Sequence, residues 1–348
     1  MRGDTVSAIT FKCKNCGAYI EFNPNDQNFK CKYCGAEYSE QEVLAETKED
    51  TVSKQEEPSE KVYNCSNCGA SIVMDGTQSS GECYYCHSPI VLEGKLSNEY
   101  RPENVIPFEF DRKAAENKFL QYTKKLRYLP RDFFSKSRLK ELSGVYYPYF
   151  DSDVSVDASF QGVGTTVTSS RSGKYEYTTT RYYNVVREGE ISFHNVFNSA
   201  LSTRRDKMAE GVLPFDKGNM KNYSPAYLAG FMAERRDRSE NDVAQDVDAE
   251  LDGYIEPVLI QDVESHYETL QGTHTYTIKD RAMRYLMVPT WVLTYIGADK
   301  KTYYYSMNGQ TGKTVGEFPL SRKKLFLHSL ISGFIVAGLL LLGGKFIW

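Results

Sequence analysis

The sequence predicts an α+β protein with two small cysteine-rich units, a mixed antiparallel-sheet and helix domain, and one C-terminal transmembrane helix. Three observations support this fold class. All eight cysteines lie before residue 87, in two sets of four with the same spacing. The middle of the chain alternates between helical and strand-like apolar spacing. A run of twenty residues without an acidic or basic side chain other than one histidine lies near the C-terminus.

Each cysteine set has the pattern Cys-X2-Cys-X14-Cys-X2-Cys, and a shift of 52 residues maps one set onto the other. Two such knuckles supply a closed tetrahedral site of four thiolates, with Zn–S distances of about 2.3 Å. Four sulfurs leave no open coordination position, which favours a structural metal over a catalytic one. We therefore predict zinc ribbon 1 at residues 8–39 and zinc ribbon 2 at residues 61–96, with two Zn²⁺ per chain. The predicted metal ligands are Cys13, Cys16, Cys31 and Cys34, and Cys65, Cys68, Cys83 and Cys86.

Other cysteine chemistries fit this pattern less well. A disulfide framework suits a short secreted chain, and we expect no signal peptide before these residues. A redox CxxC site normally lies in a βαβ context, which this region lacks. Cys83 to His87 matches the haem c attachment pattern, but it forms the second half of a ribbon repeat in which His87 replaces Gly35. Haem and iron–sulfur centres remain the alternatives to zinc, and thiolate ligands predict a reducing compartment.

The two cysteine units are separated by a strongly acidic stretch. The chain has a net charge of −4, and residues 40–60 alone carry eight acidic and two basic side chains. Because this stretch has little apolar content, we predict an extended, self-repelling acidic linker at 40–60. A charged helix over Glu40 to Lys48 is the alternative.

Residues 98–320 are expected to form one α+β cytoplasmic domain. Apolar spacing predicts helical segments, and alternating or β-branched runs predict strands. The helical segments are expected at Ala114–Leu126, Tyr223–Asp252 and Val258–His266. The strands are expected at Gly144–Phe160, Tyr175–Val186, Thr273–Ile278, Tyr285–Ile296 and Thr302–Met307. Turns are expected at Ser172-Gly173, Glu188-Gly189 and Asn308-Gly309, the last being a strong hairpin signal.

The sequence predicts no enzyme: it offers no catalytic residue, no cofactor besides zinc and no small-molecule substrate. Gly309–Thr314 (GQTGKT) resembles a phosphate loop, but Met307 stands where its first glycine is required, so a turn is favoured. With every cysteine assigned to metal, no Cys-His set remains. The other candidates are interpreted as isolated surface or packing histidines (His194, His266 and His274) and as solvated carboxylates at a strand edge (Asp151 and Asp153).

The C-terminal segment predicts a membrane anchor. Leu325 to Gly344 is long enough to cross the hydrocarbon core, at about 1.5 Å per residue. Basic residues at 322–324 precede it, and Trp348 follows it. We therefore predict a transmembrane helix at 325–344 in a single-pass, tail-anchored protein of the cell membrane, with the bulk of the chain cytoplasmic.

Zinc ribbons also occur in nucleic-acid-binding proteins, so the alternative function is a replication or transcription protein tethered to the membrane. The charges of the ribbons argue against it. Ribbon 2 is acidic on balance, and nucleic-acid binders usually present a clear basic face. In ribbon 1 four lysines are balanced by four acids: Lys12, Lys14, Lys30 and Lys32 against Glu21, Asp26, Glu37 and Glu40.

Further motifs follow the paired CxxCGA knuckles in the order 105–108 (VIPF), 144–148 (GVYYP), 227–231 (YLAGF), 308–313 (NGQTGK) and the terminal anchor. Together they resemble a family of bacterial (Firmicute) membrane proteins with a TFIIB-type double zinc ribbon, encoded beside PspA-type and SPFH-domain proteins. The resemblance implies a scaffold that recruits SPFH-domain and PspA-like partners to the cytoplasmic membrane in envelope stress, with no catalytic residues. His87 departs from the ribbon pattern.

Overall fold

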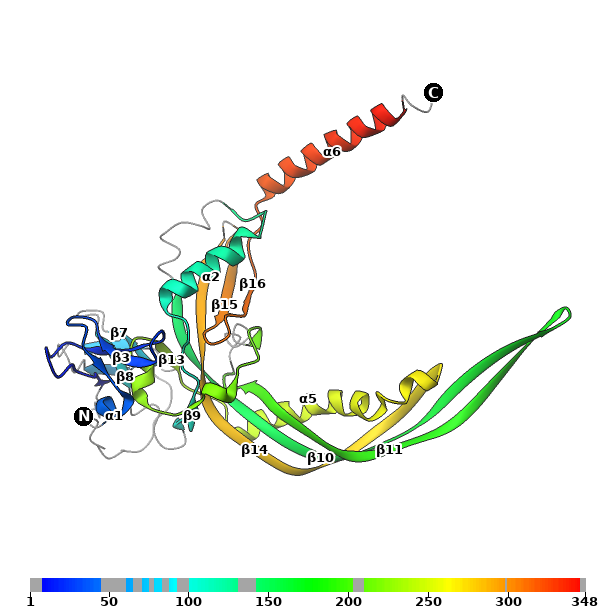
Figure 1. Ribbon diagram of the computed structural model, residues 1–348, viewed down its shortest axis with the longest axis horizontal. Helices are drawn as coiled ribbons and strands as arrows, with labels where there is room; N and C mark the ends of the chain where they lie inside the picture. The colour runs from blue at the N-terminus through cyan, green and yellow to red at the C-terminus, as the bar shows by residue number, and fades with distance from the viewer. Residues whose placement is uncertain are drawn as a thin grey trace.

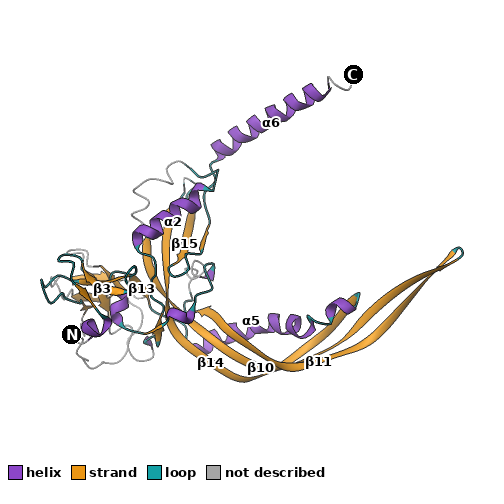
Figure 2. Cartoon of the chain, in the orientation of Figure 1, coloured by secondary structure: helices purple, strands orange, loops and turns teal. Residues whose placement is uncertain are grey.

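Three long antiparallel strands dominate the fold and join a body to a curved arm (Figure 1). They are β10 (Ser143–Ser172), β11 (Tyr175–Ser199) and β14 (Thr269–Ile296), and β10 lies between the other two. Figure 2 shows how few helices accompany the strands, in agreement with the predicted α+β class. The computed structural model describes residues 8–44, 61–64, 71–74, 78–82, 88–92, 100–130, 142–202, 210–297 and 299–344.

Within the described residues, the long strands belong to one mixed sheet of 11 strands. Its main order is β1-β8-β7-β13-β10-β14-β15-β16, with β11 paired to β10, and β9 paired to β14 and β12. The β10–β13 and β14–β9 pairs are parallel. The shorter strands are β1 (Ala8–Ile9), β7 (Gln78–Glu82), β8 (Pro89–Leu92), β9 (Asn104–Val105), β12 (Lys221–Asn222), β13 (Met232–Glu234), β15 (Thr302–Asn308) and β16 (Thr314–Gly316).

Helix α5 (Glu240–Ile260) lies along the concave side of the arm (Figure 1). A capping box between Ser239 and Asp242 starts the helix. Five of its six buried side chains recur every four residues, so they form one stripe along the helix. They are Val243, Val247, Leu251, Ile255 and Leu259, and they share a core with Val154, Val156, Ala158 and Phe160 of β10.

At the other end of the sheet, helix α2 (Arg112–Lys124) covers the body. It begins where the Ala114 N–H donates to the side chain of Asp111, and it confirms the helix expected at Ala114–Leu126 with both ends shifted. The ring of Phe119 packs edge-on against Tyr305 at 4.7 Å. The junction beneath α2 is filled by further aromatic rings, those of Phe108, Tyr146, Phe231 and Trp291.

The two cysteine-rich units attach to this body in different ways. In the first, β2 (Ile20–Asn23), β3 (Asn28–Cys31) and β4 (Glu37–Tyr38) form a separate sheet. In the second, β5 (Lys61–Asn64) pairs with β6 (Ser71–Met74), but β7 and β8 extend the central sheet through β13. Helix α1 (Glu40–Leu44) occupies the start of the predicted linker, and the rest of 40–60 lies outside the described residues.

The helix expected at Tyr223–Asp252 is wrong in its first half. Residues 225–228 form the 3-10 turn η6 (Pro225–Leu228), β13 follows, and α5 begins only at Glu240. Charge and apolar spacing could not predict β13, because this short strand forms through its pairing with β10 and β7. The segment expected at Val258–His266 is the end of α5 followed by η7 (Glu264–His266).

The expected strands are longer than the sequence pattern indicated. Glu188 and Gly189 do not form a turn: they lie inside β11, opposite Ser159 and Ala158. The strands expected at Thr273–Ile278 and Tyr285–Ile296 are one strand, β14. The charged middle of β14 stays paired with β10, because its side chains form ion pairs with neighbouring elements. The pairs are Lys279–Glu190, Arg281–Asp248 and Arg284–Asp153.

The chain ends in helix α6 (Arg322–Gly344), which leaves the body on the same side as α2 (Figure 1). The segment Arg322–Leu340 has a mean hydropathy of 1.5 and no residue buried against the rest of the protein. This helix is therefore long and apolar enough to cross a membrane. Its first turns contact the loop after α2, where Lys324 Nζ donates to the Leu129 carbonyl at 2.7 Å and His328 Nε2 lies 3.1 Å from an Arg127 nitrogen.

Candidate metal centre

Two knuckles with the same pattern of backbone hydrogen bonds build the cysteine cluster. In the first, the Cys13 N–H donates to the Ala18 carbonyl at 2.6 Å and the Gly17 N–H donates to the Cys13 carbonyl at 2.8 Å. In the second, Cys31, Gly35 and Ala36 make the same two bonds at 2.9 and 3.0 Å. Gly17 and Gly35 have φ values of 75° and 74°, a left-handed conformation that glycine adopts without strain. The CxxCGA sequence therefore determines the knuckle locally.

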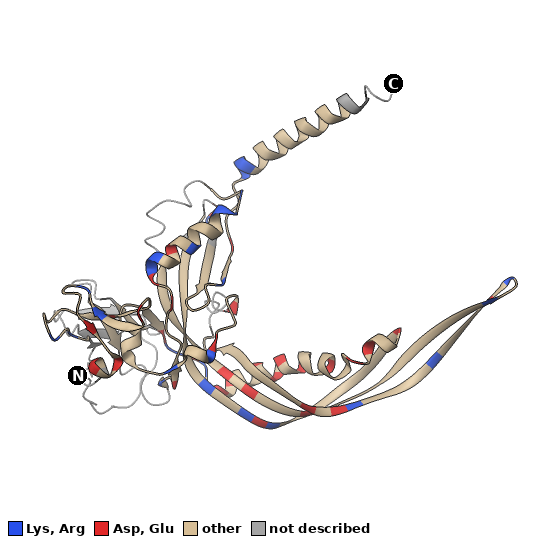
Figure 3. Cartoon of the chain, viewed as in Figure 1, with Lys and Arg blue, Asp and Glu red and all other residues tan. Residues whose placement is uncertain are grey.

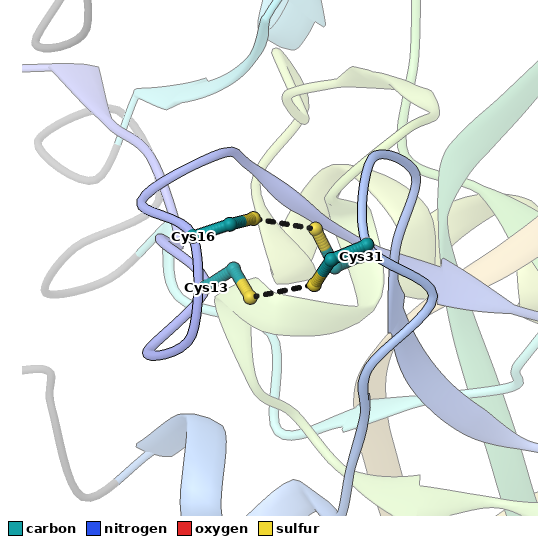
Figure 4. A group of neighbouring side chains, drawn as sticks. Cys13, Cys16 and Cys31 are labelled. Atoms are coloured by element: carbon teal, nitrogen blue, oxygen red, sulfur yellow. Dashed lines mark hydrogen bonds between the residues drawn. The ribbon is translucent and has the colours of Figure 1, made fainter.

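The knuckles bring four sulfurs together (Figure 4). All four Sγ atoms lie within 4.8 Å of one another, and the Cys13–Cys34 and Cys16–Cys31 pairs lie 3.5 and 3.6 Å apart. A tetrahedral zinc ion with Zn–S distances of about 2.3 Å holds its sulfurs about 3.8 Å apart. The residues thus fit one metal ion. Cys13 and Cys31 are buried, whereas Cys16 and Cys34 lie at the surface.

Tyr38, the last residue of β4, supports the cluster from outside the ligand set. Its hydroxyl lies 3.0 Å from Cys13 Sγ and accepts the Lys14 N–H at 3.1 Å. The hydroxyl proton is therefore free to donate to the sulfur, which lowers the pKa of Cys13 to about 6. At Cys16 the Ala18 backbone hydrogen bond favours the thiolate, but burial and the neighbouring cysteines outweigh it and raise the pKa to about 12. A bound dication would hold all four as thiolates.

The other four predicted ligands, Cys65, Cys68, Cys83 and Cys86, lie outside the described residues, as does His87. The strands on either side of them are described. In the first unit Lys12 pairs with Tyr19 and Lys30 with Glu37, each pair flanking one knuckle. In the second unit Asn64 pairs with Ser71 and Glu82 with Pro89. Each pair is displaced by 52 residues, so the register around the knuckles repeats as the cysteine spacing does.

The first unit is fixed to the body by aromatic packing. The rings of Phe22 and Phe29 contact Tyr227 of η6 at 5.1 and 5.7 Å. The Tyr227 hydroxyl donates to Glu40 of α1 at 2.9 Å, and the Phe22 N–H donates to the Ala229 carbonyl at 3.2 Å. The sequence pattern indicates neither the contact of Tyr227 with the first unit nor the contact of Tyr38 with Cys13. A tyrosine one residue before the end of the predicted cysteine unit carries no local signal of its partner.

The interpretation of Asp151 and Asp153 as solvated carboxylates is wrong. Asp151 has no exposed surface, and its Oδ2 lies 2.8 Å from Lys217 Nζ. Asp153 contacts Arg284 and lies 3.4 Å from Nδ1 of His194, which is therefore not isolated. His274 is not isolated either. Its two ring nitrogens lie 3.1 Å from Asp252 and 3.2 Å from Glu256 of α5.

The GQTGKT segment forms the connection between β15 and β16, as the turn prediction expected. The Asn308 N–H donates to the Lys313 carbonyl at 2.8 Å, and a strand rather than a helix follows. Polar side chains of this turn hold the segment before η5 (Lys217–Asn219). Asn308 Nδ2 donates to the Val212 carbonyl at 3.0 Å, and Gln310 pairs with both backbone groups of Asp216.

Comparison with known proteins finds a distant homologue in Bacillus. The chain is 26% identical over 242 residues to the uncharacterized protein YdjG of Bacillus subtilis (strain 168). The aligned region covers 68% of this chain and 69% of YdjG. No protein-family model matches the chain, and no solved structure matches it.

Proposed function

We propose that this protein is a membrane-anchored adaptor whose zinc ribbons recruit protein partners to the cytoplasmic face of the cell membrane. Following the family resemblance, the partners are SPFH-domain and PspA-like proteins, and the setting is envelope stress. The observation that carries the proposal is how the first ribbon packs on the body. Its apolar strands pack on Tyr227, while the knuckle loop turns outward and leaves Tyr33 85% exposed.

A second zinc site of the same kind is part of this proposal. It is supported by the repeated cysteine spacing and by the matching strand register around both knuckle positions of the second unit. Four sulfurs around each ion would close both sites, which suits a structural role and no catalytic one. Two ribbons in the TFIIB-type arrangement would then present two knuckle loops for recognition.

The membrane topology is likewise proposed. A basic cluster at 322–324 precedes the apolar part of α6, which favours placing the preceding residues in the cytoplasm. Figure 3 shows these basic residues at the start of the helix, followed by a segment without Lys, Arg, Asp or Glu. In this arrangement the adaptor is a single-pass protein anchored by its tail.

Local charge supports a protein partner over nucleic acid. Lys30 Nζ lies 3.0 Å from Glu37, and Lys32 Nζ lies 2.7 Å from Glu21. Such surface pairs add little stability, but they cancel the positive field that phosphate recognition needs. The experiment must therefore distinguish recruitment of protein partners from nucleic-acid binding by the membrane-tethered chain.

The test is affinity purification of the full chain from detergent-solubilised membranes. Removing the whole cysteine-rich region would also remove β7 from the central sheet, so we prefer a surface substitution. Tyr33→Ala should lose bound SPFH-domain or PspA-like proteins, whereas Tyr254→Ala, at a residue 54% exposed on α5, should retain them. Equal retention by both variants would contradict the adaptor proposal. A salt-dependent shift of DNA or RNA by the purified chain would favour the nucleic-acid alternative.

A further inference from the structure

The hairpin at the end of the arm extends past its neighbouring strand. β14 pairs with β10 only as far as Thr165↔Thr269, whereas the β10–β11 ladder continues to Ser172↔Tyr175. The chain reverses at Gly173, which has a φ of 63°. Residues 166–181, called the tip from here on, are therefore a two-stranded ribbon. Such a ribbon buries no core of its own, so its side chains are available on both faces.

The ladder register assigns the tip side chains to two faces. The even-numbered residues of β10 from Val154 to Phe160 are buried on the side that α5 covers. Side chains alternate along a strand, so the same face continues to the tip through the even-numbered residues of β10 and their partners on β11. We call this the α5-side face. It carries Thr166, Thr168, Ser170 and Ser172 of β10, and Tyr175, Tyr177, Thr179 and Arg181 of β11.

This face combines two exposed tyrosines with one basic residue, Arg181, whereas Arg171 lies on the opposite face. Tyr175 and Tyr177 are 72% and 56% exposed, and the face has no acidic residue. The whole tip carries three basic side chains against one acid, in a chain with a net charge of −4. Figure 3 shows basic residues near the end of the arm, whereas α5 is acidic. The basic residues are Arg171, Lys174 and Arg181, and the acid is Glu176.

The arm places its tip on the side of the membrane anchor. α5 and α6 lie on the same side of the arm, and the arm bends to that side as it approaches its tip (Figure 1). Tyrosine rings settle at the headgroup level of bilayers, and Lys and Arg are attracted to anionic lipid phosphates. We propose that the tip is a second, reversible membrane contact, which binds the surface of an anionic bilayer beside the α6 anchor.

This inference rests on the membrane anchorage proposed above, and it adds a function for the arm. A tip tethered to an inserted helix meets the bilayer at high effective concentration, so a weak interfacial contact is enough. Two contacts at separate points would fix the orientation of the body against the membrane. The ribbons would then be held at a set position relative to the bilayer.

The test places a fluorescent reporter on each face of the tip. Full-length protein carrying Trp348→Phe is reconstituted into vesicles of brominated phosphatidylcholine, with or without phosphatidylglycerol. Tyr177→Trp puts the reporter on the α5-side face, and Thr178→Trp puts it on the opposite face one residue away. Trp291, whose Nε1 donates to the Phe110 carbonyl at 3.1 Å inside the body, serves as the folding control.

We expect the Tyr177→Trp reporter to be quenched in anionic vesicles and the Thr178→Trp reporter to be much less so. Replacing Arg171, Lys174 and Arg181 with Gln should weaken the contact by roughly fivefold per charge. Equal quenching of both reporters, or equal quenching with and without phosphatidylglycerol, would overturn the proposal. Reporter fluorescence that changes with protein concentration instead of lipid charge would assign the tip to contact with a second copy of the chain. This result would also overturn the proposal.

Flotation of the same vesicles separates this inference from the proposed function. Reporter variants that float with the vesicles but show no quenching of the tip tryptophan overturn the proposed tip contact. They leave the proposal of the α6 anchor intact. A full-length chain that does not float with vesicles of either composition overturns both.

Discussion

Lys217 Nζ lies 2.8 Å from Oδ2 of Asp151, a carboxylate without solvent exposure in the first third of β10. Arg284 of β14 approaches the same oxygen at 3.3 Å. A buried carboxylate is stable only when cations or donors compensate for its lost hydration. The pair therefore ties the base of the arm to the η5 turn, which the GQTGKT connection holds from the other side.

Lys217→Met should lower the free energy of unfolding by about 3 kcal/mol. This is the low end of the cost of breaking a buried ion pair, because Arg284 still faces Asp151. Denaturant unfolding of the full chain in detergent measures the change. Lys221→Met, at an exposed position of β12, is the matched control and should cost less than about 0.5 kcal/mol. Similar losses for the two variants would contradict the role of the pair.

Asp153 should make stability depend on acid pH. Burial opposes its charge, but the Asn195 N–H, Lys217 and Arg284 outweigh burial and hold the pKa below its usual range. A carboxyl with a depressed folded pKa stabilises the fold above its unfolded pKa of about 3.9, and this contribution is lost as pH falls through the folded value. Asp153→Asn should therefore be destabilising at neutral pH, with a difference from the wild type that shrinks below about pH 4. A difference independent of pH would refute this assignment.

Elemental analysis of the purified chain, prepared without added metal, should give about two zinc ions per chain. Cys13→Ser and Cys65→Ser should each remove about one, because each site closes with its own four sulfurs. One zinc ion in the wild type would restrict the metal to the described cluster. Iron with visible absorption, or covalent haem, would exclude the zinc assignment.

Tyr38→Phe should weaken zinc binding at the first site by about 10- to 100-fold, since residues that hydrogen-bond to metal ligands tune affinity on this scale. The substitution removes the hydroxyl that contacts Cys13 Sγ and Lys14 and keeps the buried ring. Competition with a coloured chelator measures the loss. Tyr33→Phe, in the exposed knuckle loop, should leave zinc affinity unchanged, and equal affinities in all three proteins would remove Tyr38 from the metal site.

The anchor predicts a protease pattern. Residues before Arg322 should be protected in intact cells and cleaved in inverted membrane vesicles, because the basic cluster at 322–324 favours the cytoplasmic side. Deleting residues 325–348 should release the chain from membranes. A deleted chain that still sediments with membranes after high-salt washing would reveal a further anchor.

Elements defined by local chemistry could be predicted from the sequence. The helix at α2, the apolar segment of α6 and the turn after Asn308 follow from apolar spacing, length and turn residues within a few positions. Elements defined by distant partners could not. The pattern at Tyr223–Asp252 predicted a helix where β13 forms, and Glu188-Gly189 predicted a turn inside β11. In both places pairing with β10 determines the backbone conformation.

The sequence by itself determined the first cysteine cluster, because each CxxCGA knuckle closes with bonds among its own six residues and two knuckles need only meet. It also determined that the chain carries a helix able to cross a membrane, since length and polarity decide that property. Only the tertiary structure decided that Tyr227 holds the first ribbon, that Asp151 is buried, and that the arm presents its tip on the side of α6. These relationships join residues that lie many positions apart in the sequence. The alternation of side chains along a strand does not predict which element packs on each face of the sheet.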